Sequence, residues 1–279
     1  MSFVEDDTCY IYQDYKYGSA KNSRNLMDVV LPKENQKPGL ILYIHGGGWI
    51  TGDKTFDLKD AKEKYTAKGY SFAAINYRYA SRKNPKVNCD DILDDISLAI
   101  SNIKEIGLKH DINLEKSFLY GGSAGAHLSL QYSYTRREES AIPPVACCSL
   151  SGPTDLLDEG YYIGKNSSGQ TNMIGHLISH KLTNDNKSEY QNLLEEYSPL
   201  YHLSSKDDAV PTIIAHGELD DVVPLNNAIN LDNKLTELEV EHVFYRFPHS
   251  GHGLESELDN EIRNQVFDKM SEYVDTYLY

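Results

Sequence analysis

The sequence lacks the long apolar runs that would carry it into or through a membrane. No stretch of its 279 residues comes near the roughly 20 consecutive apolar residues that a membrane helix requires. The N-terminal stretch MSFVEDDTCY is acidic and has neither the basic start nor the apolar core of a secretory signal. We therefore expect a soluble cytoplasmic protein that has no membrane partner.

Cysteine is also scarce, and it is not arranged for metal binding or redox chemistry. The chain has four cysteines, at Cys9, Cys89, Cys147 and Cys148. None of them forms a CxxC pair, and their spacing is not that of a disulfide framework. Cys147 and Cys148 are adjacent in an apolar run, so we expect them to pack as small hydrophobic side chains. We expect no metal and no other cofactor.

Two histidines stand at a spacing that some metal sites use. His176 and His180 are four residues apart and would share one face of a helix. However, no glutamate follows His176, as it does in a zincin helix. We interpret both as histidines of a surface or lid segment rather than as metal ligands.

Basic side chains are fewer than acidic ones. The chain has 27 basic and 42 acidic side chains, a net charge of -15, and the acidic excess is spread along its length. A surface of this kind repels nucleic acid and anionic membranes. We therefore expect no nucleic-acid partner.

The chain has no linker rich in proline, glycine or serine, no repeat and no low-complexity run. The absence of these features predicts one domain spanning residues 1–279. The stretch at about 156–197 contains no strand-like run and is longer than most connections between elements. We expect it to form a lid insertion of short helices above the C-terminal edge of a sheet.

Short apolar runs dominate the rest of the chain. They lie at residues 40–44, 72–75, 117–120, 145–150, 212–215 and 243–247. Nearly continuous apolar runs are typical of parallel strands that helices cover on both faces. Before them, residues 9–17 and the alternating Met27, Val29 and Leu31 predict an antiparallel pair. The pattern predicts an α/β fold with a mostly parallel, twisted sheet.

Two stretches have the spacing of amphipathic helices. The first follows Asn88 and is marked by Ile92, Ile96, Ala99, Ile100 and Ile103. Acidic residues occupy its early turns and Lys104 lies near its end, which is the polarity that a helix dipole favours. The second, a final helix, is predicted from Leu258, Ile262, Val266 and Met270.

Residues 120–125, YGGSAG, place Ser123 between a predicted strand and a predicted helix. This is the G-x-S-x-G pattern of a nucleophile elbow, a strained turn that projects the serine Oγ from the sheet. Gly121 and Gly125 leave room, because a Cβ at either position would collide as the chain folds back. The helix that begins here directs its N-terminal N–H groups at any negative oxygen formed on Ser123.

A second glycine-rich motif, HGGGW at residues 45–49, follows the first of the apolar runs. Three consecutive glycines cost backbone entropy, so bare backbone must be needed there. An oxyanion hole needs such backbone, because N–H groups must reach a tetrahedral intermediate. A tight turn and a phosphate-binding loop are the alternatives, although the spacing fits neither a P-loop nor G-x-G-x-x-G.

A serine hydroxyl needs a base, and the base needs an acid to orient it. HGELDDVVP follows the run at 212–215, and PHSGHG follows the run at 243–247. Ser123, Asp220 and His252 have the chain order Ser, Asp, His that accompanies such an elbow. Asp155 and Asp221 compete for the role of acid. Asp220 is preferred because it falls just past a strand end, with room for one helix and one strand before His252.

Taken together, HGGGWI with GDK, GGSAGAHL, HGELDDVVP and SGHGL resemble the esterase/lipase branch of the α/β-hydrolase family. The likeness is to bacterial carboxylesterases grouped with hormone-sensitive lipase, acetyl esterases and feruloyl-type esterases. It implies an eight-stranded sheet whose second strand is antiparallel. It also implies Ser123 as nucleophile, Asp220 as acid and His252 as base, with oxyanion N–H groups from Gly47, Gly48 and Ala124. Many relatives have Asp before the serine, where this chain has Gly122.

The resemblance and the motifs together predict a serine carboxylesterase that acts on a small-molecule ester. Because the 156–197 stretch is polar, we expect short-acyl or compact aromatic esters as substrates. Trp49, Tyr161 and Tyr162 are the predicted pocket residues. The alternatives are an amidase, an arylformamidase or a small peptidase with the same three residues, and a non-catalytic receptor that keeps the fold.

Overall fold

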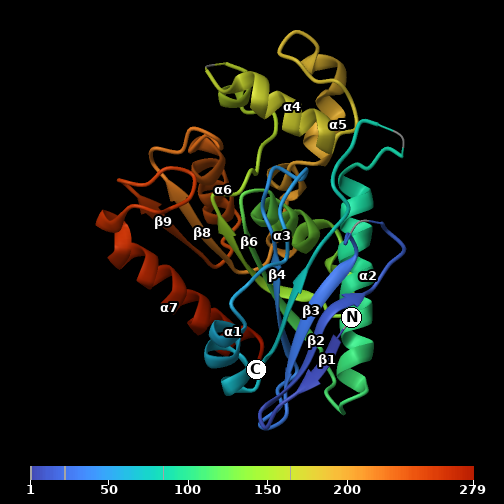
Figure 1. Cartoon of the computed structure of the whole chain (residues 1–279). Helices are drawn as coiled ribbons and strands as arrows, with labels where there is room; N and C mark the ends of the chain where they lie inside the picture. The colour runs from blue at the N-terminus through green and yellow to red at the C-terminus, as the bar shows by residue number, and fades with distance from the viewer. Residues whose placement is uncertain (1, 22, 84, 164) are drawn as a thin grey trace.

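Every apolar run that the sequence predicted as a strand is a strand in the structure. The computed structural model describes residues 2–21, 23–83, 85–163 and 165–279. Its strands are β1 (Ser2–Glu5), β2 (Cys9–Lys16), β3 (Leu26–Pro32), β4 (Gly39–Ile44), β5 (Ser71–Ile75), β6 (Lys116–Gly122), β7 (Pro144–Leu150), β8 (Thr212–Gly217) and β9 (His242–Phe247). They pair in the order β1-β2-β3-β5-β4-β6-β7-β8-β9, so one sheet runs through the molecule (Figure 1).

The sheet has two parts that differ in strand direction. β1, β2 and β3 pair antiparallel, and β3 also pairs antiparallel with β5. From β5 to β9 every pairing is parallel. The predicted antiparallel start and the mostly parallel sheet are confirmed.

The sheet has one strand more than the eight that the resemblance implied. The additional strand is β1, which pairs with β2 and is exposed along its whole length. An exposed edge strand buries no apolar face, so no apolar run marks it in the sequence. Among the other eight strands the second one, β3, is antiparallel to its neighbours, as the resemblance implied.

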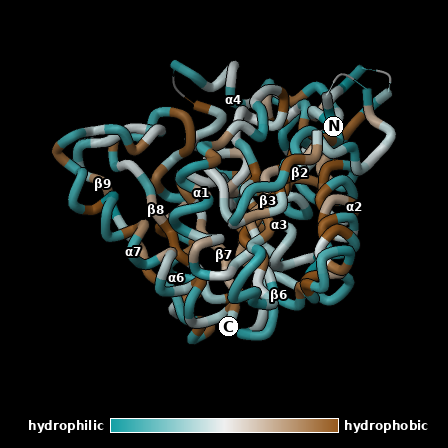
Figure 2. The backbone as a smooth tube through the Cα atoms, turned by 60° about the horizontal axis from the view of Figure 1, so that its bottom comes forward, coloured by the Kyte–Doolittle hydropathy of each residue, from teal (hydrophilic) through white to brown (hydrophobic). Residues whose placement is uncertain are grey.

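Helices cover both faces of the sheet, which explains why its strands are apolar at consecutive positions. They are α1 (Leu58–Lys64), α2 (Cys89–Leu108), α3 (Ala124–Thr135), α4 (Ser167–Leu177), α5 (Gln191–Glu196), α6 (Asn226–Glu237) and α7 (Asn260–Tyr277). Leu40 and Leu42 of β4 pack in one cluster with α2 and α3, whereas Ile41 packs in the opposite cluster with α1 and α7. Figure 2 shows this apolar character along the strands and α2.

The two predicted amphipathic helices are present, with one correction. α2 begins at an Asn88 capping box, and its predicted apolar stripe is fully buried. In α7, Val266 and Met270 are buried as predicted, but Leu258 is 76% exposed and precedes the helix in a short turn. Tyr273 and Val274 complete the buried stripe in its place. Among the described residues, no helix is long and apolar enough to cross a membrane.

The 156–197 segment contains α4, α5 and short 3₁₀ turns, and its described residues contain no strand. Figure 1 shows α4 and α5 together at one end of the molecule, beyond α3. Met173 of α4 reaches the loop that follows β4, since a Cβ built on Gly48 would lie 2.4 Å from the Met173 Sδ. This contact places α4 over the loop at the C-terminal end of β4.

The end of β4 presses against the turn that joins β6 to α3. A Cβ on Gly125 would lie 2.0 Å from the carbonyl oxygen of Ile44, and one on Gly121 would lie 2.3 Å from the same atom. Backbone oxygens cannot move aside as a flexible side chain can. The predicted collision at both glycines is confirmed, and it fixes where α3 starts.

Gly125→Ala should therefore destabilise the fold by at least about 2 kcal/mol, because the new methyl group forces β4 and α3 apart. Gly169→Ala is the matched control, since nothing lies within 4 Å of a Cβ there. As Gly169 lies inside α4, that change should be neutral or should stabilise by about 0.5–1 kcal/mol. Urea unfolding of both variants measures the difference, and equal stabilities would contradict the close contact.

Candidate active site

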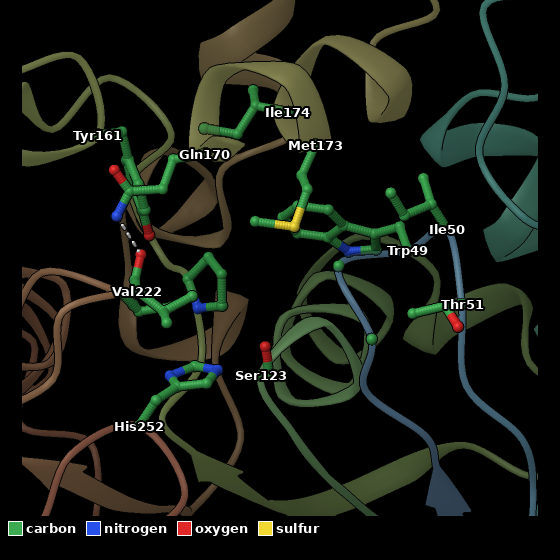
Figure 3. Close-up of a pocket in the computed structure, with 14 residues that line it drawn as sticks. Trp49, Ile50, Thr51, Ser123, Tyr161, Gln170, Met173, Ile174, Val222 and His252 are labelled. Atoms are coloured by element: carbon green, nitrogen blue, oxygen red, sulfur yellow. Dashed lines mark hydrogen bonds between the residues drawn. The ribbon is translucent and has the colours of Figure 1, made fainter. Parts of the chain in front are cut away.

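Ser123 lies in the turn between β6 and α3. β6 ends at Gly122 and α3 begins at Ala124, and Ser123 between them has φ 55° and ψ −122°. A positive φ is costly for a serine and persists only where the surrounding structure enforces it. Here the Ser123 amide donates to the carbonyl of Leu150 at 2.8 Å, and its carbonyl accepts from the His127 amide at 3.0 Å. The turn presents the Ser123 side chain to a cavity at the sheet end (Figure 3).

His252 and Asp220 come from loops that follow two neighbouring strands. Asp220 follows β8 and His252 follows β9, and these strands pair with each other. The His252 Nδ1 lies 2.8 Å from the Asp220 Oδ2. An ionised carboxylate only accepts hydrogen bonds, so Nδ1 carries the proton and Nε2 keeps a free lone pair. Figure 3 shows the His252 ring directed toward Ser123.

The Asp220 carboxylate is fully buried, yet it has four donors around it. Its Oδ1 accepts from the amides of Val222 and Val223 at 2.9 Å each, and its Oδ2 faces His216 and His252. Burial opposes ionisation of this carboxyl, but hydrogen bonds from His216 and His252 outweigh burial and hold the pKa of Asp220 well below its usual range. The site therefore keeps a charged acid behind His252.

The two competing acids lie elsewhere. The Asp155 carboxylate accepts from the Leu157 amide at 2.9 Å, and burial raises the pKa of Asp155. The Asp221 carboxylate is exposed and accepts from Asn166 at 3.2 Å. Of the three aspartates, Asp220 is the one that the structure brings to His252.

His216 belongs to this site but was missed by the sequence reasoning, which used it only to locate the strand end. Its Nε2 lies 3.0 Å from the Val223 carbonyl and 3.2 Å from the Asp220 Oδ2. Both partners are acceptors, so Nε2 carries the proton and donates it. The sequence did contain a signal for His216, because this histidine ends the apolar run at 212–215 and stands four residues before Asp220. In the structure its side chain is buried, with 1% of the residue exposed.

The HGGGW motif forms a tight loop next to Ser123. Gly47 and Gly48 have φ of +103° and +56°, a region that favours glycine. The Gly47 carbonyl accepts from the amides of Ile50 and Thr51 at 3.1 Å each, which closes the loop. Within the described part of the chain, the amides of Gly47 and Gly48 have no hydrogen-bond partner. They line the same cavity as Ser123 and are free to bind an oxygen there.

Ser123 opens into a cavity of about 410 Å³, which we name the α4-side cavity. It is lined by Gly47, Gly48, Trp49, Ile50, Thr51, Ser123, Pro153, Tyr161, Gln170, Met173, Ile174, Val222, Val223 and His252. Trp49 and Tyr161, two of the three residues predicted to line a pocket, are among these lining residues. Figure 3 shows Met173 and Ile174 of α4 reaching toward the cavity, and neither was predicted.

Tyr162 does not belong to the α4-side cavity, and its prediction as a pocket residue there is wrong. Its hydroxyl donates to the Leu156 carbonyl at 2.8 Å, and the Lys187 ammonium lies over its ring. Adjacent residues in a short turn point in different directions, so only one of the two tyrosines reaches the cavity.

His176 and His180 do not act as a pair. The Arg82 guanidinium donates to the His176 Nε2 at 3.2 Å, while the His180 ring packs on Tyr190 with centroids 4.9 Å apart. Among the residues that the structure describes, no group of three or more His, Cys, Asp or Glu side chains is placed to hold a metal ion.

Comparison with known proteins identifies the family and the fold. The family model described as BD-FAE matches residues 27–235, which is well over half of the chain. The chain belongs to the BD-FAE family. Esterase LipC from Mycobacterium tuberculosis is 22% identical over 82% of this chain and 57% of its own length. Esterase LipQ from the same organism is 22% identical over 76% of this chain and 49% of its own. The chain thus spans about half the length of these curated relatives.

Solved structures show the same fold along nearly the whole BD-FAE chain. A truncated carbohydrate esterase from gut microbiota superposes with a TM-score of 0.76 at 20% identity, covering 98% of this chain and 97% of that one. Thermogutta terrifontis esterase 2, phosphonylated by sarin, superposes with a TM-score of 0.70 at 19% identity and covers 97% and 95%. These likenesses confirm the α/β-hydrolase fold.

A buried histidine joins three parts of this BD-FAE site. The Trp49 Nε1 donates to the His127 Nδ1 at 3.1 Å, and the His127 Nε2 lies 2.7 Å from the Tyr197 carbonyl. Indole nitrogen only donates and a carbonyl only accepts, so His127 is neutral with its proton on Nε2. Trp49 has φ 62°, which a bulky residue adopts only under constraint. His127 thus holds the glycine loop, α3 and the end of the 156–197 segment together.

The buried His127 should make the fold sensitive to acid. Burial lowers the pKa of His127 from 6.5 to about 4. Between these pH values His127 binds a proton in the unfolded chain but not in the folded protein. The free energy of unfolding therefore falls as pH decreases from 6.5 to 4. This histidine should account for a loss of about 3 kcal/mol, since each pKa unit is worth about 1.4 kcal/mol.

Urea unfolding at a series of pH values tests this expectation with His127→Gln. The wild type should lose its stability advantage over the variant as pH falls to 4, because glutamine does not titrate. Parallel pH dependences in the two proteins would contradict a neutral, buried His127.

Proposed function

We propose that this BD-FAE chain is a serine carboxylesterase that forms an acyl-enzyme on Ser123. The observation that carries the proposal is the 2.8 Å hydrogen bond from His252 to the buried Asp220, beside a serine held on a strained turn. The bond leaves the imidazole Nε2 free to accept the proton of the Ser123 hydroxyl. The names of the relatives, which are esterases, support the same reaction class.

The first half of the reaction acylates Ser123. Its Oγ forms a bond to the ester carbonyl carbon while its proton passes to the His252 Nε2. The carbonyl oxygen becomes an oxyanion, which accepts hydrogen bonds from the amides of Gly47, Gly48 and Ala124. The carbon–oxygen bond to the alcohol then breaks, and His252 returns its proton to the departing alcohol oxygen.

Water completes the cycle by the same route. His252 takes a proton from water as the water oxygen bonds to the acyl carbon, and the Ser123 Oγ leaves with that proton. Asp220 fixes the imidazole tautomer and stabilises the imidazolium, but it does not take up the proton itself. The low pKa of Asp220 supports this role, because a carboxylate that stays ionised can balance the charge on His252 in both halves of the cycle.

The substrates we propose are small esters with short acyl chains or compact aromatic acyl groups. The α4-side cavity, at about 410 Å³, is near the small end of ligand pockets. We assign the 156–197 segment as a cap inserted in a single domain, because its helix α4 supplies Gln170, Met173 and Ile174 to the cavity wall.

Ser123→Ala should lower kcat for a nitrophenyl ester by at least about 10⁴-fold, because alanine has no hydroxyl with which to form the acyl-enzyme. A fluorophosphonate should label wild type at Ser123 and should not label the variant, as peptide mass spectrometry would show. A nitroanilide with the same acyl group should react far more slowly than the ester. Labelling at another serine, or equal turnover of the anilide, would contradict the proposal.

Asp220→Asn should lower kcat by about 10³–10⁴-fold, because an amide can hold the imidazole in the wrong tautomer. The controls are Asp155→Asn and Asp221→Asn, which should each cost less than about 30-fold. Steady-state kinetics on one soluble ester measures all three. A crippled Asp155 variant together with a mild Asp220 variant would reject the assignment of the acid.

A further inference from the structure

A second cavity opens from Ser123 on the side of α7. It has a volume of about 360 Å³, and the described residues that it shares with the α4-side cavity are Ser123 and His252. Its walls include the apolar side chains of Tyr43, Phe247, Leu254, Val266 and Phe267. We name it the α7-side cavity. An ester bound with its carbonyl at Ser123 thus has two separate spaces for the groups on either side of that carbonyl.

A buried polar side chain in the α7-side cavity has no hydrogen-bond partner among the residues that the structure describes. Ser151 lines this cavity and is 2% exposed, and its Oγ makes no hydrogen bond to any described residue. Its backbone is held at φ 51° while its amide donates to the Ala215 carbonyl at 2.8 Å. Buried hydroxyls are normally paired, because leaving one unpaired costs stability. The Ser151 Oγ itself is closed to solvent, so a substrate group satisfies this hydroxyl when the side chain turns from the wall toward the cavity.

The wall of the α7-side cavity is also preformed. The Arg263 guanidinium donates to the Leu254 carbonyl at 2.6 and 3.0 Å and to the Ser256 carbonyl at 3.0 Å. From the other side, the buried Asp259 carboxylate accepts from the Ser250 hydroxyl at 2.6 Å. The loop that carries His252 is therefore pinned from both sides to the start of α7. A wall that is already ordered binds a ligand with less loss of entropy.

The position of His252 indicates which half of the ester enters this cavity. The alcohol oxygen must come within reach of the His252 Nε2, because that nitrogen protonates it as the bond breaks. Gly253 and Leu254, which follow His252 in the chain, line the α7-side cavity. Gly47 and Gly48, whose amides we propose hold the carbonyl oxygen, line the α4-side cavity, whereas Gly46 of the same loop lines the α7-side cavity.

We propose that the α7-side cavity binds the alcohol half of the substrate and that Ser151 recognises a second oxygen on that alcohol. This inference rests on the proposed function. The substrate class is an ester of a polyol or glycol, in which a hydroxyl or ether oxygen lies a few bonds from the ester oxygen. Simple alkanol esters fill the same space but leave the Ser151 hydroxyl unpaired.

A matched pair of esters tests the proposal directly. 2-Hydroxyethyl butyrate and propyl butyrate have the same acyl group and the same number of heavy atoms. Wild type should favour the hydroxyethyl ester in kcat/KM, and Ser151→Ala should reduce that preference about 3- to 10-fold, the range expected for one hydrogen bond. The ratio of the two esters is compared within each protein, so that a change in activity common to both substrates cancels.

Two measurements separate recognition from a structural role. Ser151→Ala removes a hydroxyl that has no partner in the free protein, so its thermal unfolding midpoint should not fall. Met173→Leu is the matched control in the other cavity, and it should leave the hydroxyethyl-to-propyl ratio unchanged. An unchanged ratio in Ser151→Ala would overturn the inference while leaving the proposed function intact.

The assignment of the two halves has its own test. Propyl 4-hydroxybutyrate and propyl pentanoate carry the extra oxygen, or its methyl equivalent, on the acyl side. Ser151→Ala should not change the kcat/KM ratio of these two substrates. If the substitution changes this ratio and leaves the hydroxyethyl-to-propyl ratio unchanged, the assignment of the alcohol half to the α7-side cavity is wrong. If wild type hydrolyses none of the four esters and Ser123 resists labelling, the proposed function fails and this inference fails with it.

Discussion

The contact of the Ile44 carbonyl with Gly121 and Gly125 is the constraint on which the rest of the site depends. β4 and β6 are adjacent parallel strands, so the loops after them lie at the same edge of the sheet. Only residues without a Cβ let α3 begin directly against the backbone of β4. This close approach brings Ser123, the N-terminal amides of α3 and the free amides of Gly47 and Gly48 to one place. Any side chain at either glycine would move Ser123 away from the amides that we propose stabilise the oxyanion.

Buried hydrogen bonds then fix the orientation of each ring in the site. Asp220 is surrounded by two backbone amides and two imidazoles, and these donors keep its carboxylate charged in spite of burial. The charge in turn sets the tautomer of His252. A second set of bonds runs from Trp49 through His127 to Tyr197, and there too each partner permits only one assignment of the proton. Such networks are costly unless every member is satisfied, so they determine a single arrangement.

The cavities gain their shape from parts of the chain that are far apart in sequence. One wall of the α4-side cavity comes from the 156–197 segment, whose composition is polar, yet Gln170, Met173 and Ile174 share one face of α4 at helical spacing. The α7-side cavity is closed by the last helix and by the loop after β9. The unpaired Ser151 hydroxyl can be recognised only in the tertiary structure, because its burial and its lack of a partner among the described residues depend on how β7, β9 and α7 pack.

The sequence by itself determined the class of fold and the chemistry expected at Ser123. Strands buried on both faces must be apolar at consecutive positions, so the runs at 40–44 and 212–215 could be recognised as strands. Glycine is required at Gly46, Gly47, Gly121 and Gly125, because a Cβ at each would lie 2.7 Å or less from a backbone oxygen. Local patterns did not reveal β1, because an exposed strand has no apolar signal. They also placed Leu258 inside a helix and Tyr162 in the cavity, since spacing predicts a face only where an element is regular.

Only the tertiary structure decided that His216 shares the Asp220 carboxylate, that His127 holds Trp49, and that two cavities meet at Ser123. These relations join residues from different strands and loops, and their distances depend on how whole elements pack, which no local sequence pattern records.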